Sequence, residues 1–413
     1  MYGLRRVLWE REGVKAIHKQ VAAQYKMVSE AKSAKSIDAA AKTLKEAGKN
    51  LETILEQVAK LDPEGAKIAQ KLQNAEESQK TLSASQAVLH QSLRGAWTTV
   101  KVTSPVPNAT AGNKKARPAP SADMQIPADC KQIRGILFSF MGTVEHDPLV
   151  MQVLREENFV QIKLREVGLF TVTGQDPATF DALLAALAQA SKHPELVHVP
   201  WLTAGCSTTT ITARNIAYWK PERCLGVIHF AGGNMHQSLP PAPCSLAGIP
   251  LLAVNGEWEC FGPEGGIRPE YGRQTQWIMI REQFLRLRRQ DPRHFLSLLV
   301  IPRANHAGWS WTASPIAALF VRKAIKARLP EVQGLPSAPI TCKTIVSGWL
   351  SDADICEPKQ APAPEGTFAG KPDQAFWHLD EEMAKMIEEY HRGKFLLPDP
   401  SKKNPVPADW PPK

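Results

Sequence analysis

The sequence predicts an α/β protein whose main domain, residues 94–330, is built on a mostly parallel, doubly wound sheet. In that region short apolar runs of strand length alternate with helical patterns of about ten residues or more, as in parallel strands joined by crossover helices. Apolar residues make up 43% of the chain and charged residues 22%, which is typical of an ordinary globular protein. We expect two further parts, a helical module over residues 1–93 and a proline-rich C-terminal extension with one helix over residues 331–413.

The N-terminal module is predicted from apolar residues at helical spacing. Leu44, Leu51 and Val58 share one face, and Asp62-Pro63 is typical of a helix start. We expect two or three antiparallel helices forming a hairpin or small bundle. The near-heptad spacing leaves open a coiled coil that joins two chains as a homodimer.

The main domain begins with an expected strand at Ala96–Val102, and an extended connection rich in proline follows to residue 131. Arg134–Phe140 is an apolar run that predicts a buried strand. The remaining strands are expected at 159–164, 201–204, 226–230, 250–254 and 295–301. The helices are expected at 147–157, 178–191, 210–219, 271–289 and 315–328, with one more at 380–390 in the C-terminal extension.

Charge and cysteine usage exclude several classes of function. The net charge of +9 comes from basic residues spread along the chain, which favours solubility and no nucleic-acid partner. The seven cysteines contain no Cys-x-x-Cys pair, so no metal site is expected. No apolar run reaches the ~20 residues that a membrane span needs. No signal peptide is evident, so we expect a cytoplasmic protein, or a periplasmic or secreted one if a leader was removed.

The strongest functional signal is Gly205-Cys206-Ser207-Thr208-Thr209, which lies between an expected strand and an expected helix. A tight strand–turn–helix connection of the form Gly-x-Ser-x-Gly exposes its serine as a nucleophile. Thr209 stands where the pattern has its last glycine. A serine that merely favours a turn is the alternative for Ser207 alone.

An acid and a histidine follow in the order that a catalytic triad needs. The strand expected at 250–254 is followed by Glu257 and Glu259, and the strand at 295–301 by His306. A serine hydroxyl needs a base to take its proton, and the base needs an acid to orient it. We favour Glu259 as the acid, because the acid commonly lies three residues after the glycine in this type of strand end, and keep Glu257 as second choice. Taken singly, His306 could be a loop histidine and either glutamate a surface residue.

Two backbone N–H groups are needed to bind the developing oxyanion. We expect one from Thr208, directly after the serine, and one from the turn Met141-Gly142-Thr143 after the Arg134–Phe140 strand. Four side chains near these elements in the sequence are candidates for the substrate pocket, although packing or a structural ion pair explains them equally well. They are Trp258, Arg268, Trp309 and His236.

These motifs resemble the α/β-hydrolase superfamily over about residues 94–330, and more narrowly its bacterial esterase-like members. Those members share the run His193-Pro194-Glu195-Leu196, Val199-Pro200-Trp201, the serine turn and Pro221-Glu222-Arg223. The resemblance implies the α/β-hydrolase fold and hydrolysis of an ester or related acyl bond through an acyl-enzyme on Ser207, with no metal or organic cofactor. The Gly-Cys-Ser-Thr turn is also similar to tannases and feruloyl esterases, but Asn305 and Ala307 flank His306 where those enzymes place a cysteine.

The expected function is therefore that of a serine esterase acting on a small-molecule, carbohydrate or lipid ester. Two departures from the family pattern, Thr209 and the Ser-Phe-Met-Gly sequence at the oxyanion turn, support an alternative. In that alternative the domain has lost catalysis and serves as a binding or scaffold module through its N-terminal helices.

Overall fold

A computed structural model of the chain describes residues 96–106, 119–140, 144–145, 147–165, 170, 172, 176–232, 245–256, 276–301, 313–355 and 358–392. They belong to the second of two compact units, which comprise Met1–Ser78 and Gln79–Lys413. The expected helical module and its homodimer contact fall on residues 1–93, outside the described residues, and stay predictions.

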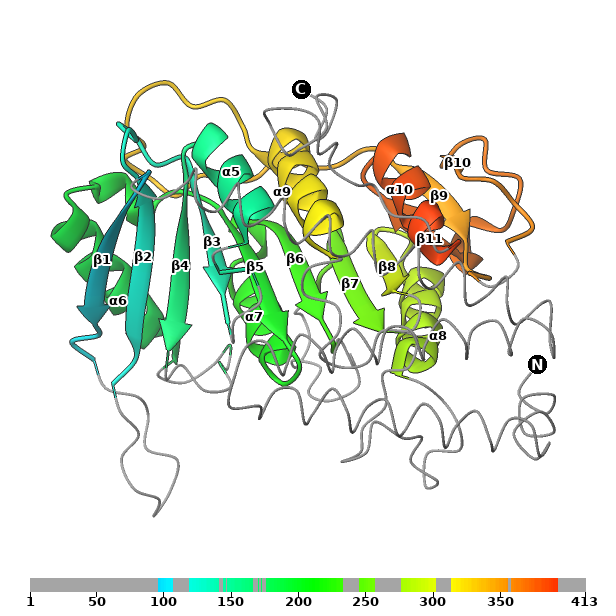
Figure 1. The fold of residues 1–413 in the computed structure, drawn as a ribbon, viewed down its shortest axis with the longest axis horizontal. Helices are drawn as coiled ribbons and strands as arrows, with labels where there is room; N and C mark the ends of the chain where they lie inside the picture. The colour runs from blue at the N-terminus through cyan, green and yellow to red at the C-terminus, as the bar shows by residue number, and fades with distance from the viewer. Residues whose placement is uncertain are drawn as a thin grey trace, which may run out of the picture. The chain divides into compact units, whose positions relative to one another are not determined.

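The described residues form an eight-stranded sheet with the order β1-β2-β4-β3-β5-β6-β7-β8 (Figure 1). Strands β4, β3, β5, β6, β7 and β8 are parallel to one another, whereas β2 runs antiparallel to both β1 and β4. The strands are β1 Trp97–Thr103, β2 Ser121–Pro127, β3 Gly135–Ser139, β4 Phe159–Arg165, β5 Trp201–Cys206, β6 Cys224–Phe230, β7 Leu251–Gly256 and β8 Leu296–Ile301.

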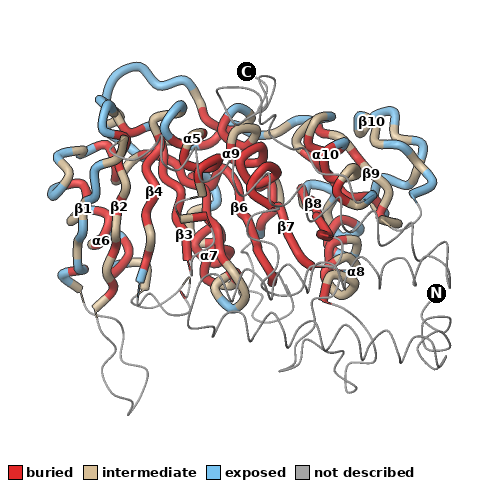
Figure 2. Tube along the Cα trace, in the orientation of Figure 1, coloured by how far each residue is buried: buried red, intermediate tan, exposed pale blue. Residues whose placement is uncertain are grey.

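Helices cover both faces of this sheet, as the sequence predicts (Figure 1). They are α5 Pro148–Glu156, α6 Asp176–Ser191, α7 Thr209–Trp219, α8 Gln276–Gln290 and α9 Ser314–Arg328. Side chains of α5 and α9 belong to one hydrophobic core, and those of α6, α7 and α8 belong to the other. Strands β3, β6, β7 and β8 are buried along their whole length, because a parallel sheet covered on both faces leaves no polar side (Figure 2).

Strand β2 corrects the expectation of a continuous extended connection after the first strand. Residues 121–126 alternate between partly buried and buried positions, which is the period of a strand with one face on a core. Pro120 and Pro127 bound this strand, and prolines inside a run argue against a strand. Here they stand at its ends, where no ladder hydrogen bond is lost.

The C-terminal region adds a small sheet that the sequence did not indicate, with the order β10-β9-β11. Its elements are β9 Trp349–Asp352, β10 Ala363–Pro364, β11 Ala375–His378 and the expected helix α10 Glu381–His391. Helix α10 buries Met383, Met386 and Ile387 in the same core as α5 and α9. The end of the described chain is thus packed into the main sheet domain. Within the described residues, no helix has the length and apolarity to cross a membrane.

Candidate active site

Ser207 occupies the connection between β5 and α7, after Cys206 and two residues before the helix begins. Its φ of +52° lies in the left-handed region, which costs an L-residue roughly 1–2 kcal/mol. The Ser207 N–H donates to the carbonyl of Phe230 at the end of β6, at 2.9 Å. A strained serine between a parallel strand and a helix is the arrangement of a nucleophile elbow.

Thr209 supplies hydrogen bonds that a glycine at this position could not make. Its hydroxyl donates to the Cys206 carbonyl at 2.7 Å, and it accepts from the Cys206 N–H at 2.8 Å. Thr210 adds a third bond, because its hydroxyl donates to the Ser207 carbonyl at 2.7 Å. These side chains hold Cys206 and Ser207, so the departure from the usual pattern is accommodated locally.

Two glycines allow the backbones around the elbow to approach closely. A Cβ on Gly205 would lie 2.4 Å from the Thr209 carbonyl oxygen, and one on Gly232 would lie 2.8 Å from the Ser207 carbonyl oxygen. Such distances exclude any larger side chain unless the backbone moves. Gly205 is the first glycine of the motif, whereas Gly232 follows β6 and has the role of a second close-packing glycine.

The strands that precede the other candidate residues end at the same edge of the sheet as β5. The register pairs Cys206 with Phe230 and Phe230 with Val254, and Gly256 at the end of β7 with Ile301 at the end of β8. In Figure 1 the arrowheads of β5, β6 and β7 point to this common edge. The predicted triad positions therefore follow neighbouring parallel strands that end together.

Of the predicted site residues, the structure describes Ser207 and Thr208. Thr208 is exposed and stands at the N-cap of α7, where the helix dipole is positive. The others lie outside the described residues, and their places in space stay predictions. They are Glu257, Glu259, His306, Met141, Gly142, Thr143, Trp258, Arg268, Trp309 and His236.

Two buried polar side chains near the elbow were not predicted as parts of the site. Asn255 is fully buried in β7, and its amide donates to the Gly232 carbonyl at 3.4 Å. His229 is fully buried in β6, opposite Gly205 in the register, as expected for a packed histidine. Burial, and then the charge of Arg214, lowers the pKa of His229 to about 3. A neutral, packed imidazole is a poor candidate for the catalytic base. The sequence signal for both is a polar residue inside an apolar strand.

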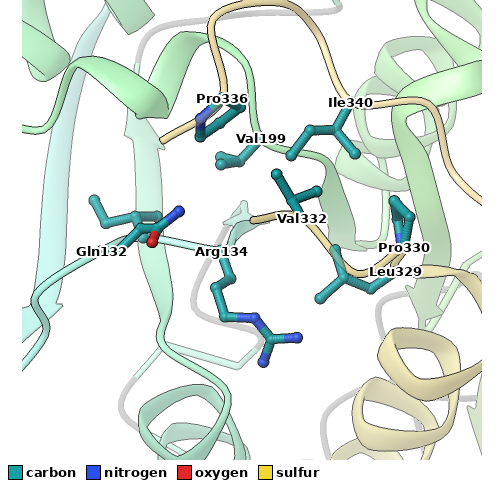
Figure 3. Close-up of a pocket in the computed structure, with 9 residues that line it drawn as sticks. Gln132, Arg134, Val199, Leu329, Pro330, Val332, Pro336 and Ile340 are labelled. Carbon is teal, nitrogen blue, oxygen red and sulfur yellow. The ribbon is translucent and has the colours of Figure 1, made fainter. Parts of the chain in front are cut away.

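A pocket of about 70 Å³ lies at the other end of the strands (Figure 3). Arg134 and Val199, which precede β3 and β5, line it together with Leu329 beyond the end of α9. It contains none of the predicted site residues.

Among the residues that the structure describes, no group of three His, Cys, Asp or Glu side chains is arranged to hold a metal ion.

Comparisons with known proteins find similar solved structures. No family model and no curated protein matches the sequence. Solved structures similar to the chain include a bacterial heroin esterase at 15% identity, covering 57% of this chain and 86% of the other, with a TM-score of 0.37. A dienelactone hydrolase from Anabaena variabilis is 16% identical, covering 57% and 100%, with a TM-score of 0.34. An S-formylglutathione hydrolase from Agrobacterium tumefaciens is 12% identical, covering 56% and 95%, with a TM-score of 0.35.

At these sequence identities and TM-scores, the similarity carries no information about activity. The expected α/β fold follows from the molecule itself, through its strand order, its helices on both faces and its strained serine turn.

Proposed function

We propose that the protein is a serine hydrolase of the α/β-hydrolase superfamily that cleaves a carboxylic ester or a related acyl bond. Ser207 is the nucleophile, His306 the general base and then acid, and Glu259 the orienting acid. The observation that carries the proposal is the left-handed backbone of Ser207 between β5 and α7, stabilised by the Thr209 and Thr210 hydroxyls. Strain of about 1–2 kcal/mol at a polar turn residue is typical of a site where function requires the conformation.

The distances between strands allow the three residues to meet. With a strand spacing of about 4.8 Å, the end of β7 lies about 10 Å from β5 and the end of β8 about 14 Å. The five residues that follow Ile301, ending at His306, can span about 16 Å when extended. Glu257 follows Gly256 directly, and Glu259 lies two residues beyond Glu257. The histidine and the acid can therefore approach the serine without any change in the sheet.

The reaction proceeds through an acyl-enzyme. His306 takes the Ser207 hydroxyl proton as the oxygen attacks the acyl carbon, and the resulting oxyanion collapses with loss of the alcohol, which receives that proton. Water then attacks the acyl-enzyme, with His306 again as base. The carboxylic acid leaves, and the proton returns to Ser207.

Two backbone N–H groups bind the oxyanion in the proposed mechanism. Thr208 at the N-terminus of α7 supplies one, where the helix dipole adds to it. The turn Met141–Thr143 supplies the other. It follows β3, which pairs directly with β5 through Ser139 and Ala204. The substrate is a small-molecule, carbohydrate or lipid ester, and Trp258, Arg268, Trp309 and His236 are the proposed pocket residues.

Hydrolysis of p-nitrophenyl esters of increasing acyl length tests this proposal. We expect Ser207→Ala and His306→Gln each to lower kcat by about 10³-fold or more. Glu259→Gln should lower kcat more than Glu257→Gln. The acyl length with the highest kcat/KM bounds the acyl pocket.

The chain offers a matched control in a second serine–histidine pair. The Ser351 hydroxyl lies 2.7 Å from Nε2 of His378, within the small C-terminal sheet. Ser351→Ala should leave hydrolysis unchanged. Activity that survives Ser207→Ala contradicts the proposal, and absence of activity in the wild-type chain favours the scaffold alternative.

A further inference from the structure

Asp147 connects the first turns of two helices that lie far apart in the sequence. One carboxylate oxygen accepts from the N–H groups of Leu149 at 3.1 Å and Val150 at 3.0 Å, which caps α5. The other oxygen accepts a hydrogen bond from the hydroxyl of Ser314, the first residue of α9. Ser314 is 1% exposed, so this contact is shielded from solvent.

The carboxylate serves both helices. Ala313, the N-cap residue of α9, makes no side-chain capping bond, and the Asp147 carboxyl binds the next residue, Ser314, at the positive end of this helix. Burial raises the pKa of the Asp147 carboxyl, and the bonds from Ser314, Val150 and Leu149 oppose that rise. Helices α5 and α9 lie side by side on the same face of the sheet (Figure 1).

Each helix directly follows a segment that the proposed mechanism uses. Helix α5 follows the turn Met141–Thr143, and α9 follows the segment that contains His306. At the start of the first segment, the Phe140 N–H donates to the Ala204 carbonyl of β5 at 3.1 Å. Beyond the turn, the buried Glu145 carboxylate lies 3.7 Å from the Lys163 ammonium on β4. Asp147 then ties the first turn of α5 to the first residue of α9.

We infer that Asp147 is a positioning residue that fixes the first turns of α5 and α9 relative to each other through Ser314, and that the proposed reaction depends on this link because the chain before each helix carries a proposed site element. The inference rests on the proposed function, because it assigns Asp147 a part in the geometry of that reaction. The proposed reaction assigns no chemical step to Asp147. A misplacement of about 1 Å in such a support can cost about 10²-fold in rate.

Ester hydrolysis by full-length Asp147→Asn, Ser314→Ala and the double variant tests the inference, with thermal unfolding of each. We expect each single variant to lower kcat by about 10- to 100-fold, with KM changed by no more than about threefold. The double variant should lose no more than the worse single variant, because both remove one interaction. Ser314→Thr keeps a hydroxyl and should restore most of kcat.

Asp380→Asn is the matched control for lost stability. Asp380 caps α10 by accepting from the Met383 N–H at 3.0 Å, and it pairs with Lys323 in the second half of α9, away from Ser314. It takes no part in the proposed reaction. This variant should lower the melting temperature about as much as Asp147→Asn and leave kcat unchanged.

The outcomes separate this inference from the proposed function. Wild-type protein that hydrolyses no ester rejects the proposed function and this inference with it. Active wild-type protein with unchanged kcat in Asp147→Asn and Ser314→Ala rejects the inference alone. The inference is also rejected if Asp380→Asn loses as much kcat as Asp147→Asn for the same fall in melting temperature.

Discussion

At the scale of single residues, Thr209 shows how a departure from a motif can be compatible with the structure. The motif has glycine at this position because a helix and a strand approach each other there. In this chain the close contact falls on Gly205 and Gly232, and the Thr209 hydroxyl is bonded to Cys206 on both its N–H and its carbonyl. The sequence predicted a problem at Thr209, whereas the structure finds hydrogen bonds that hold the elbow.

This role predicts that the hydroxyl, and not the size of the side chain, matters at position 209. Thr209→Val keeps the shape but removes the two hydrogen bonds that the hydroxyl makes with Cys206, so we expect a loss of about 1–3 kcal/mol in the free energy of unfolding and a lower kcat. Thr209→Ser should retain most of both. Denaturant unfolding and ester hydrolysis are the measurements, and equal values for the valine and serine variants would refute the role.

At the scale of elements, the packing of α7 against β5 positions the serine. A Cβ added to Gly205 would meet the backbone of Thr209 in the first turn of the helix, so any side chain at this position would push the helix away from the strand. Ser207, in the left-handed conformation, donates its N–H to the Phe230 carbonyl and accepts at its own carbonyl from the Thr210 hydroxyl. The strand, the strained residue and the helix start therefore act as one unit.

We expect Gly205→Ala to lower the free energy of unfolding by about 1–3 kcal/mol, because its Cβ would meet the Thr209 backbone and not a flexible side chain. Labelling or hydrolysis at Ser207 should fall with it. Gly366→Ala is the matched control, since nothing lies within 4 Å of its added Cβ. If both variants are equally stable, the close approach does not constrain the elbow.

The elements differed in how far the sequence could predict them. The buried parallel strands were predicted because each is an apolar run bounded by turn residues. Strand β2 was missed because prolines stand at both its ends. The strands β9, β10 and β11 have two to four residues each, which is too short for a periodic pattern. The serine and the strand ends followed from local patterns, but Asp147 and Asn255 act through residues distant in sequence.

At the scale of the whole molecule, three histidines make stability depend on pH, of which His229 and His378 are fully buried and His391 is partly buried. His229 in β6, His378 in β11 and His391 in α10 each have a pKa lowered to about 3, with burial as the largest cause. Their folded-state pKa lies below the value of about 6.5 in the unfolded chain. Between pH 6.5 and 3 the unfolded chain therefore binds more protons, so stability rises with pH in this window and is lost as pH falls.

Each such histidine contributes up to about 1.4 kcal/mol per pH unit in this window. The loss of unfolding free energy from pH 7 to pH 5 should therefore be about 2 kcal/mol smaller in His378→Gln than in the wild type. Denaturant unfolding at the two pH values measures this difference. If the variant and wild type lose the same stability, His378 is not held neutral by burial.

Covalent labelling of the full chain by a fluorophosphonate probe tests most directly whether Ser207 is the nucleophile. Mass spectrometry identifies the labelled peptide. The Ser207 oxygen would displace fluoride from phosphorus, adding the phosphonyl group to that serine. We expect one labelled site, Ser207, and no labelling of Ser207→Ala. The Ser351→Ala variant should be labelled like the wild type. A wild-type chain that does not react, or that reacts equally after Ser207→Ala, would contradict the assignment of Ser207 as the nucleophile.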